Sequence, residues 1–236
     1  RETHAFRGHD GPVNAVAASH DLLTVASAGR DGTVRLWDVP TGEALHVLKE
    51  HTGPVSAVAF APDGAWVVSA ADEAIVWDAN IGKRRLTLRG HAGPVTAVAV
   101  SADGRRLATG GADRTVRVWD AAAGKEMLVC PGHTAGVTAV AFNPDGTRLV
   151  SGGADRTVRV WDAADGKAVH VMAGHVAEVR GVAFAADGAR IGSASADGTV
   201  KQWAPEDALE VFTQPAHPRA ATGEAFAAGG RVAAST

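Results

Sequence analysis

The sequence contains a single cysteine, Cys130, so the chain cannot form an internal disulfide bond. The formal net charge is only −3 at pH 7, and such a balance argues against nucleic acid as the main partner. No apolar run approaches the length of a membrane span. The sequence also lacks a Gly-rich phosphate loop with its lysine, and no cofactor is expected.

The overall composition is that of an ordinary globular protein, with 46% hydrophobic and 21% charged residues among 236. A chain of this length can form one all-β domain. The first residue is Arg1 rather than Met, so a signal peptide or an upstream domain would lie outside this sequence. We expect a cytoplasmic location.

One stretch, residues 131–162, recurs along the chain. Each copy contains a His, a Ser or Thr 18 residues later, an Asp and a Trp, and the steps between successive His residues are 42, 40, 42 and 42. The five sets are His9, Ser27, Asp31 and Trp37; His51, Ser69, Asp72 and Trp77; His91, Thr109, Asp113 and Trp119; His133, Ser151, Asp155 and Trp161; and His175, Ser193, Asp197 and Trp203. A period in the forties that is built of short β-runs is typical of a β-propeller.

The repeat that begins at His133 predicts four short strands, at residues 137–142, 149–152, 157–162 and 168–172. Pro-Asp-Gly and Asp-Gly turns separate the strands. The first and third strands are apolar on both faces, so each four-stranded sheet must pack between two neighbours around a ring. The predicted fold is therefore all-β, with antiparallel blades at about 8–49, 50–89, 90–131, 132–173 and 174–215.

The Gly-His pairs before the first strands and the Trp-Asp pairs that end the third strands resemble the WD-repeat β-propeller family. The pairs are Gly8-His9, Gly90-His91, Gly132-His133 and Gly174-His175, and Trp37-Asp38, Trp77-Asp78, Trp119-Asp120 and Trp161-Asp162. The resemblance implies that the His, Ser or Thr, Asp and Trp of each repeat form a buried hydrogen-bond relay, and that the propeller binds proteins or peptides. Ala/Gly/Arg-rich, near-identical repeats suggest a bacterial-type protein.

The hydrogen bonds of the relay are also expected on physical grounds, since a Trp N–H and a His ring that are buried between sheets must find hydrogen-bond partners.

A set of Ser, His and Asp is also typical of a hydrolase active site. Five copies around one ring would then be five active sites, each capped by a Trp, and no nucleophile elbow accompanies them. The repeat His residues are too regularly spaced for a metal site. We predict no catalytic residue, no metal site, and an apolar filling role for Cys130 in an outer strand.

The ends of the chain depart from the repeat. Residues 1–7 align with a fourth strand, and the resemblance implies that this strand completes the last blade of the ring. A partial repeat at 216–236 begins at His217 and stops before its third strand. Because an unclosed ring leaves sheet edges exposed, we expect the chain to be part of a seven-bladed propeller, with a six-bladed ring as the alternative. The second repeat is two residues short, so its Asp72 is the least secure relay member.

Function is therefore expected on the surface. On the face that carries the relay loops, the predicted partner-binding residues are Asn14, Arg30, Glu178 and Arg180, where the other repeats carry mostly small residues. On the opposite face Trp66 occupies a position that is polar in the other repeats. It is a candidate partner-binding residue, because an exposed Trp beside Arg is typical of an interface, and a Trp folded onto its own blade is the favoured alternative. The predicted function is a non-catalytic interaction scaffold or sensing module in a larger signalling or regulatory protein. The alternative is a propeller enzyme with its site at the channel mouth, near Glu178 and Arg180.

Overall fold

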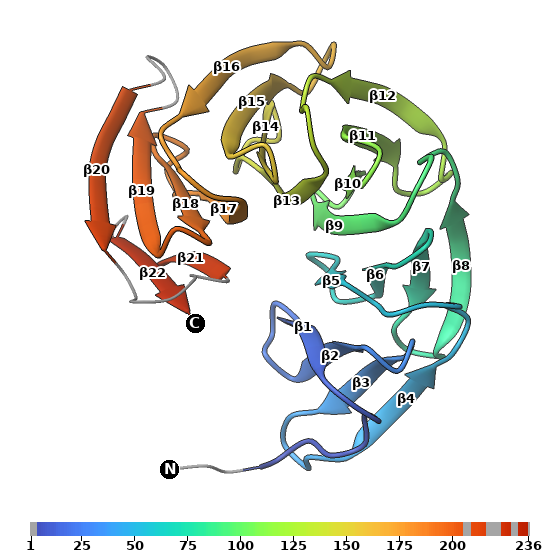
Figure 1. The fold of residues 1–236 in the computed structure, drawn as a ribbon. Coiled ribbons are helices and arrows are strands. Elements are labelled where there is room, and N and C mark those ends of the chain that lie inside the picture. The colour runs from blue at the N-terminus through green and yellow to red at the C-terminus, as the bar shows by residue number, and fades with distance from the viewer. Residues whose placement is uncertain (1–3, 205–208, 216–222, 228–230, 236) are drawn as a thin grey trace.

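The computed structural model describes residues 4–204, 209–215, 223–227 and 231–235. Within these residues the chain is all-β and has five four-stranded antiparallel sheets followed by a two-stranded one. Figure 1 shows the sheets as successive blades around an arc, with the first strand of each blade inside and the fourth outside. The predicted all-β blade architecture is confirmed. None of the described residues belongs to a helix of the length and apolar character needed to cross a membrane.

The strands of each blade follow one another in sequence and pair with their neighbours. Blade 1 is β1 (Val13–Ala18), β2 (Thr24–Gly29), β3 (Val34–Asp38) and β4 (Ala44–Leu48); blade 2 is β5 (Ala57–Phe60), β6 (Trp66–Ala70), β7 (Ala74–Asp78) and β8 (Lys83–Leu88); blade 3 is β9 (Val95–Val100), β10 (Arg106–Gly111), β11 (Thr115–Asp120) and β12 (Glu126–Pro131); blade 4 is β13 (Val137–Phe142), β14 (Arg148–Gly153), β15 (Thr157–Asp162) and β16 (Ala168–Ala173); blade 5 is β17 (Val179–Phe184), β18 (Ile191–Ser195), β19 (Thr199–Ala204) and β20 (Leu209–Pro215); and the partial sheet is β21 (Gly223–Ala227) and β22 (Arg231–Ser235).

Four apolar cores fill the interfaces between consecutive blades. Each core contains the Trp of the later blade, namely Trp77, Trp119, Trp161 and Trp203. The inner strands approach so closely that small residues are needed, since a Cβ added to Gly152 would lie 2.5 Å from Cγ1 of Val179 in the next blade. Cys130 is fully buried in the core between blades 3 and 4, and burial raises the pKa of its thiol to about 11. The thiol is an apolar filler, as predicted.

The two ends of the chain differ in how well they match the sequence-based expectation. The partial repeat forms two paired strands, as expected, although His217 lies outside the described residues. At the other end, residues 4–7 form no strand, so the predicted outer strand at 1–7 is not observed there. The reason is that a strand needs a neighbouring strand to pair with, and the described part of the chain supplies none at this place.

The N-terminal segment nevertheless packs as a fourth strand would. Phe6 covers the Trp of blade 1, with 5.5 Å between the Phe6 and Trp37 ring centroids. His4 lies against Gly42 just as His46 of β4 lies against Gly82 of blade 2. The segment therefore occupies the place of an outer strand while its pairing partner is missing from the described residues.

The face of β1 that points away from blade 2 is exposed. Val16 is 68% exposed, whereas Val140, at the same place in blade 4, is 8% exposed because blade 3 covers it. Val13 is likewise 49% exposed and its counterpart Val137 is fully buried. This face has the composition of a blade interface but no blade against it among the described residues.

Candidate functional site

The structure brings the four residue types of the repeat together in a hydrogen-bond relay. In blade 4 the indole Nε1–H of Trp161 donates to Oγ of Ser151 at 2.8 Å. The same Oγ lies 2.8 Å from Nε2 of His133, and Nδ1 of this ring lies 2.9 Å from Oδ2 of Asp155. A carboxylate only accepts, so Nδ1–H donates to Asp155 and Nε2 accepts from the hydroxyl. The relay therefore runs in one direction, from indole to carboxylate.

The same contacts occur in blades 1, 3 and 5. The hydroxyl oxygen lies 2.7 Å from His Nε2 and 2.8 Å from Trp Nε1 in all three blades. The His Nδ1 atom lies 2.9 to 3.0 Å from the nearest Asp oxygen. The residues are His9, Ser27, Asp31 and Trp37; His91, Thr109, Asp113 and Trp119; and His175, Ser193, Asp197 and Trp203.

The relay Asp also ties two loops together. In blade 4 Asp155 accepts hydrogen bonds from the backbone N–H of Thr134, beside the relay His, and from the hydroxyl of Thr157. Burial alone would raise the pKa of Asp155, but these donors and His133 outweigh burial and hold this pKa at about 2. Asp113 of blade 3 has the same set of donors, and its pKa is also about 2. The carboxylate of this relay stays ionised at any ordinary pH.

Burial has the opposite result for the relay histidines. It lowers the pKa of His91, His133 and His175, and the neighbouring carboxylates offset this effect only in part. The rings are therefore neutral near pH 7, which is the state that leaves Nε2 free to accept from the hydroxyl.

Blade 2 has an incomplete relay. Its Ser69 still lies 2.7 Å from both His51 Nε2 and Trp77 Nε1. Asp72 does not reach His51 and instead accepts from the hydroxyl of Thr52. The shorter turn explains the difference, because Asp72 follows Ser69 by three residues while the other relay Asp residues follow by four. Burial, offset by the charge of Asp72, lowers the pKa of His51 to about 4.

The relay resembles a hydrolytic triad in its atoms but cannot act as one. The Ser or Thr is fully buried in blades 2 to 5, and its oxygen already accepts from an indole N–H. A nucleophile must reach a substrate carbonyl, and a hydroxyl with no exposed surface cannot do so. Within the described residues, no group of three or more His, Cys, Asp or Glu side chains is placed to hold a metal ion.

Trp66 is buried, so the structure does not support the candidate interface role and agrees with a Trp folded onto the molecule. It is only 7% exposed and lies in the core between blades 2 and 3, together with Val68 and Ala121. The position fifteen residues after the relay His points toward the following blade. For blade 2 the following blade is blade 3, whose apolar side chains, among them Ala121, cover the indole of Trp66.

Asn14 also has a structural partner. Its Nδ2 donates to the carbonyl oxygen of Val55 in blade 2 at 2.9 Å. Thr138 holds the same position in blade 4, and its hydroxyl lies within hydrogen-bonding distance of the carbonyl of Val179 in blade 5. This position thus links a blade to the next one, a role that spacing alone did not reveal.

Of the three charged residues predicted for the relay face, Arg30 and Arg180 are exposed and Glu178 is half-buried, and the structure does not bring all of them together. Glu178 and Arg180 form an ion pair, with 3.1 Å between Arg180 Nε and Glu178 Oε1. Arg30 follows β2 in blade 1, at the other end of the arc from β17 (Figure 1). Arg30 and Arg180 therefore do not form a joint anion site in this chain.

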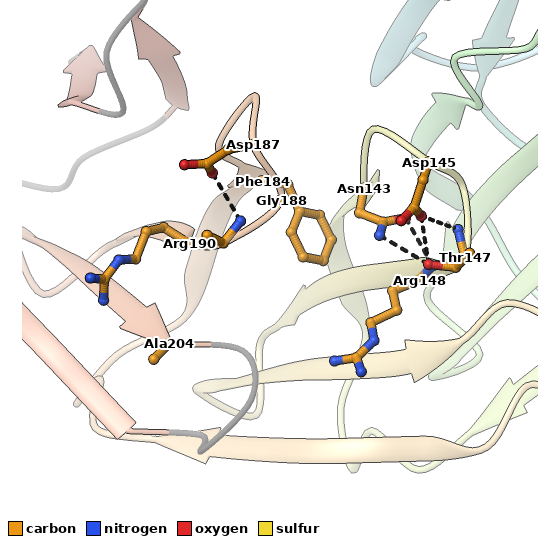
Figure 2. Close-up of a pocket in the computed structure, with 10 residues that line it drawn as sticks. Asn143, Asp145, Thr147, Arg148, Phe184, Asp187, Gly188, Arg190 and Ala204 are labelled. Atoms are coloured by element: carbon orange, nitrogen blue, oxygen red, sulfur yellow. Dashed lines mark hydrogen bonds between the residues drawn. The ribbon is translucent and has the colours of Figure 1, made fainter.

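A pocket of about 650 Å³ opens on the opposite face, between the turns of blades 4 and 5. Arg148, Phe184, Asp187 and Arg190 line it, with Asp145 at the blade 4 turn. In Figure 2 the guanidinium groups of both arginines extend away from the two aspartates. The sequence did carry a signal for this site, namely an Arg fifteen residues after the relay His in blades 3, 4 and 5.

Comparisons with known proteins agree with this geometry. The family model described as WD domain, G-beta repeat matches residues 1–38, 42–78, 82–120, 124–162 and 166–204. Each matched segment after the first begins one or two residues before an outer strand and ends with the last residue of the third strand of the next blade. The match at 1–38 therefore aligns the N-terminal segment with an outer strand.

Individual relatives match over about one repeat. The ribosome biogenesis protein erb1 of Neurospora crassa is 57% identical over 37 residues, which is 16% of this chain and 5% of the relative. The small ribosomal subunit protein RACK1y of Oryza sativa subsp. japonica is 51% identical over 43 residues, 18% of this chain and 13% of the relative. The matches thus cover far less than two thirds of these relatives. Both organisms are eukaryotes, so a bacterial type is not supported.

Proposed function

The chain belongs to the WD40-repeat family, and on that premise we propose that it is a non-catalytic scaffold or sensing module that binds other proteins or peptides. The observation that carries this proposal is the state of the relays. The relay Ser or Thr of each of blades 2 to 5 is buried and already hydrogen-bonded to a Trp and a His. What the chain offers to other molecules is its outer surface, formed by loops and turns on a rigid support.

The proposal extends to the setting of the chain. A scaffold of this kind serves a larger signalling or regulatory protein, in the cytoplasm, and its ring has seven blades. The exposed apolar face of β1 supports a further blade, because the same face is covered in every later blade interface. The enzyme alternative rests on Glu178 and Arg180, and these side chains pair with each other.

The test is affinity capture with purified chain and two surface variants. We expect wild-type chain to retain specific proteins, and the variants Arg30→Ala and Arg180→Ala to lose part of that set. Lys125→Ala is the matched control, since it removes one exposed positive charge outside these loops. Capture that is identical for all variants would remove the relay face from the proposal. Substrate turnover by the pure chain that disappears in Glu178→Ala would overturn the scaffold itself.

A further inference from the structure

The near-identical repeats allow one arginine position to be compared at successive blade interfaces. Arg106, the first residue of β10, reaches from blade 3 to blade 4 and lies over the ring of Phe142, with 5.5 Å from Cζ to the ring centroid. Its Nη2 donates to the carbonyl oxygen of Gly146 at 2.6 Å, and its Nη1 to that of Ala163 at 3.4 Å. Arg106 is thus a bridge between two blades, and its guanidinium is occupied.

Arg148 has the same position at the next interface but not the same contacts. Phe184 and Gly188 replace Phe142 and Gly146, yet no hydrogen bond or ion pair joins the Arg148 guanidinium to another described residue. A Cβ added to Gly146 would lie 2.6 Å from Arg106 Nη2, whereas for Gly188 the nearest atom is Cδ of Pro144 at 3.7 Å. Among the described residues, the place that Arg106 fills is therefore open at this interface, and it forms the pocket in Figure 2.

The charged side chains of this pocket differ in burial, and a charged group that is partly buried has more need of a partner than one in water. The two acids are exposed and bonded within their own turns, Asp145 to the backbone N–H of Thr147 and Asp187 to that of Ala189. Arg148 and Arg190 are half-buried, and neither guanidinium has an acidic partner among the described residues. A partly desolvated guanidinium gains most from an anionic oxygen, which it can bind through two N–H groups.

We propose that the pocket between blades 4 and 5 binds a carboxylate or phosphate group of a partner peptide through Arg148 and Arg190. The ring of Phe184, between the two arginines in Figure 2, receives an apolar side chain next to the acidic one. The inference rests on the proposed function, since it names the chemistry of a peptide that the scaffold takes. It places binding on the face opposite the relay loops.

The test is an NMR titration of the full chain that follows the Nε–H signals of its arginines. The probes are three short capped peptides, Gly-Phe-Glu-Gly, Gly-Phe-Gln-Gly and the same peptide with phosphoserine in place of Glu. We expect the Arg148 and Arg190 signals to shift with the Glu or the phosphoserine peptide and not with the Gln peptide. The tighter of the two anionic peptides identifies the source of the anion.

Variants link the shift to the pocket. Arg148→Gln and Arg190→Gln should each weaken peptide binding about tenfold, the loss expected for one hydrogen bond between charged groups. Lys125→Gln, with the same change of charge on the same face, should bind as the wild type does. Arg106→Gln should lower the melting temperature and leave peptide binding intact, because its guanidinium is already used between blades.

The outcomes separate this inference from the scaffold proposal. Equal shifts with the Gln peptide, or unchanged affinity in both Arg148→Gln and Arg190→Gln, would overturn the anion pocket even if affinity capture succeeds. Peptide binding that depends on both arginines would uphold the pocket even if capture finds no partner through the relay face.

Discussion

At the scale of single residues, one hydroxyl oxygen in each relay serves two buried neighbours. In blade 4 the Ser151 hydroxyl donates to His133 and accepts from Trp161. Both neighbours are buried, with His133 5% exposed and Trp161 0% exposed, so loss of one member leaves a buried polar group without a partner. Such a group costs about 1–3 kcal/mol, more than the hydrogen bond itself contributes.

Substitution of the relay should therefore lower stability by predictable amounts. We expect His133→Ala to reduce the free energy of unfolding by about 1–3 kcal/mol, because Ser151 and Asp155 lose a partner. Trp161→Ala should cost about 3–5 kcal/mol, because it also opens a cavity. His51→Ala is the control and should cost less than His133→Ala, since Asp72 does not bond to His51. Urea denaturation measures these differences, and a wild-type midpoint for His133→Ala would contradict the relay.

The lowered pKa values predict acid sensitivity in two stages. Below pH 6.5 the unfolded chain binds protons on histidines that stay neutral in the folded chain, where the pKa of His51 is about 4. Below pH 3.8 the carboxylates of Asp113 and Asp155 bind protons in the unfolded chain but stay ionised in the folded chain, where their pKa values are about 2. In both windows the unfolded state binds more protons, so stability falls as pH falls. Urea midpoints at pH 7.5 and at pH 5 check the first stage, and equal midpoints would contradict it.

Spacing in the sequence was enough to find the relay residues of blades 1, 3, 4 and 5, because each repeat shows which residue types recur, while Asp72 of the shorter blade 2 does not bond to its His. The contact of Trp66 with the following blade could not be found in this way. Its repeat counterparts are polar, and its environment comes from Ala121 of the following blade, more than fifty residues along the chain. Contacts between blades are not visible in the pattern of one repeat.

At the scale of elements, local turn chemistry explains why strand positions were predictable. In blade 4 the turn glycine Gly146 has a φ of 71°, which suits a residue without Cβ, and β13 ends before this turn. Pairing of the N-terminal segment was not predictable, because its partner would have to come from elsewhere in the ring. A strand is defined by its neighbours as much as by its own residues.

The links between first strands should contribute to the stability of the arc. The hydroxyl of Thr138 lies within hydrogen-bonding distance of the carbonyls of Gly152 in its own blade and Val179 in the next. We expect Thr138→Val, which keeps the shape and removes the hydroxyl, to lower the free energy of unfolding by about 1 kcal/mol. Thr87→Val, on an outer strand, is the control and should leave the urea midpoint unchanged. Equal midpoints for both variants would show that the link between blades contributes nothing.

At the scale of the whole molecule, the two sides of blade 1 differ in what covers them. One side of blade 1 contacts blade 2 through a full core, and the other side exposes the valines of β1. The sequence indicated an unclosed ring by counting strands, and the structure adds where the uncovered face lies. The number of blades remains a proposal.

A pair of matched substitutions can compare the covered and uncovered faces. We expect Val140→Asp to unfold the chain or lower its stability by several kcal/mol, because it puts a charge into the core between blades 3 and 4. Val16→Asp, at the same place in blade 1, should leave the thermal melt of the chain nearly unchanged, since this side chain is 68% exposed. Joined to a further blade, the chain with Val16→Asp should lose stability. A large loss in the chain alone would mean that β1 is already covered.

Blades 3 and 4 share an identical run of sequence, residues 110–122 and 152–164, which covers the end of the second strand, the turn and the entire third strand. A refolding chain therefore has two places in which the same third strand and turn can pack. We expect that an error during refolding can place this segment one blade out of order, with Trp119 in the space of Trp161 or the reverse. Such a kinetic trap would keep native-like strand content and local side-chain order. The trapped state would differ from the native state only in the order of its blades.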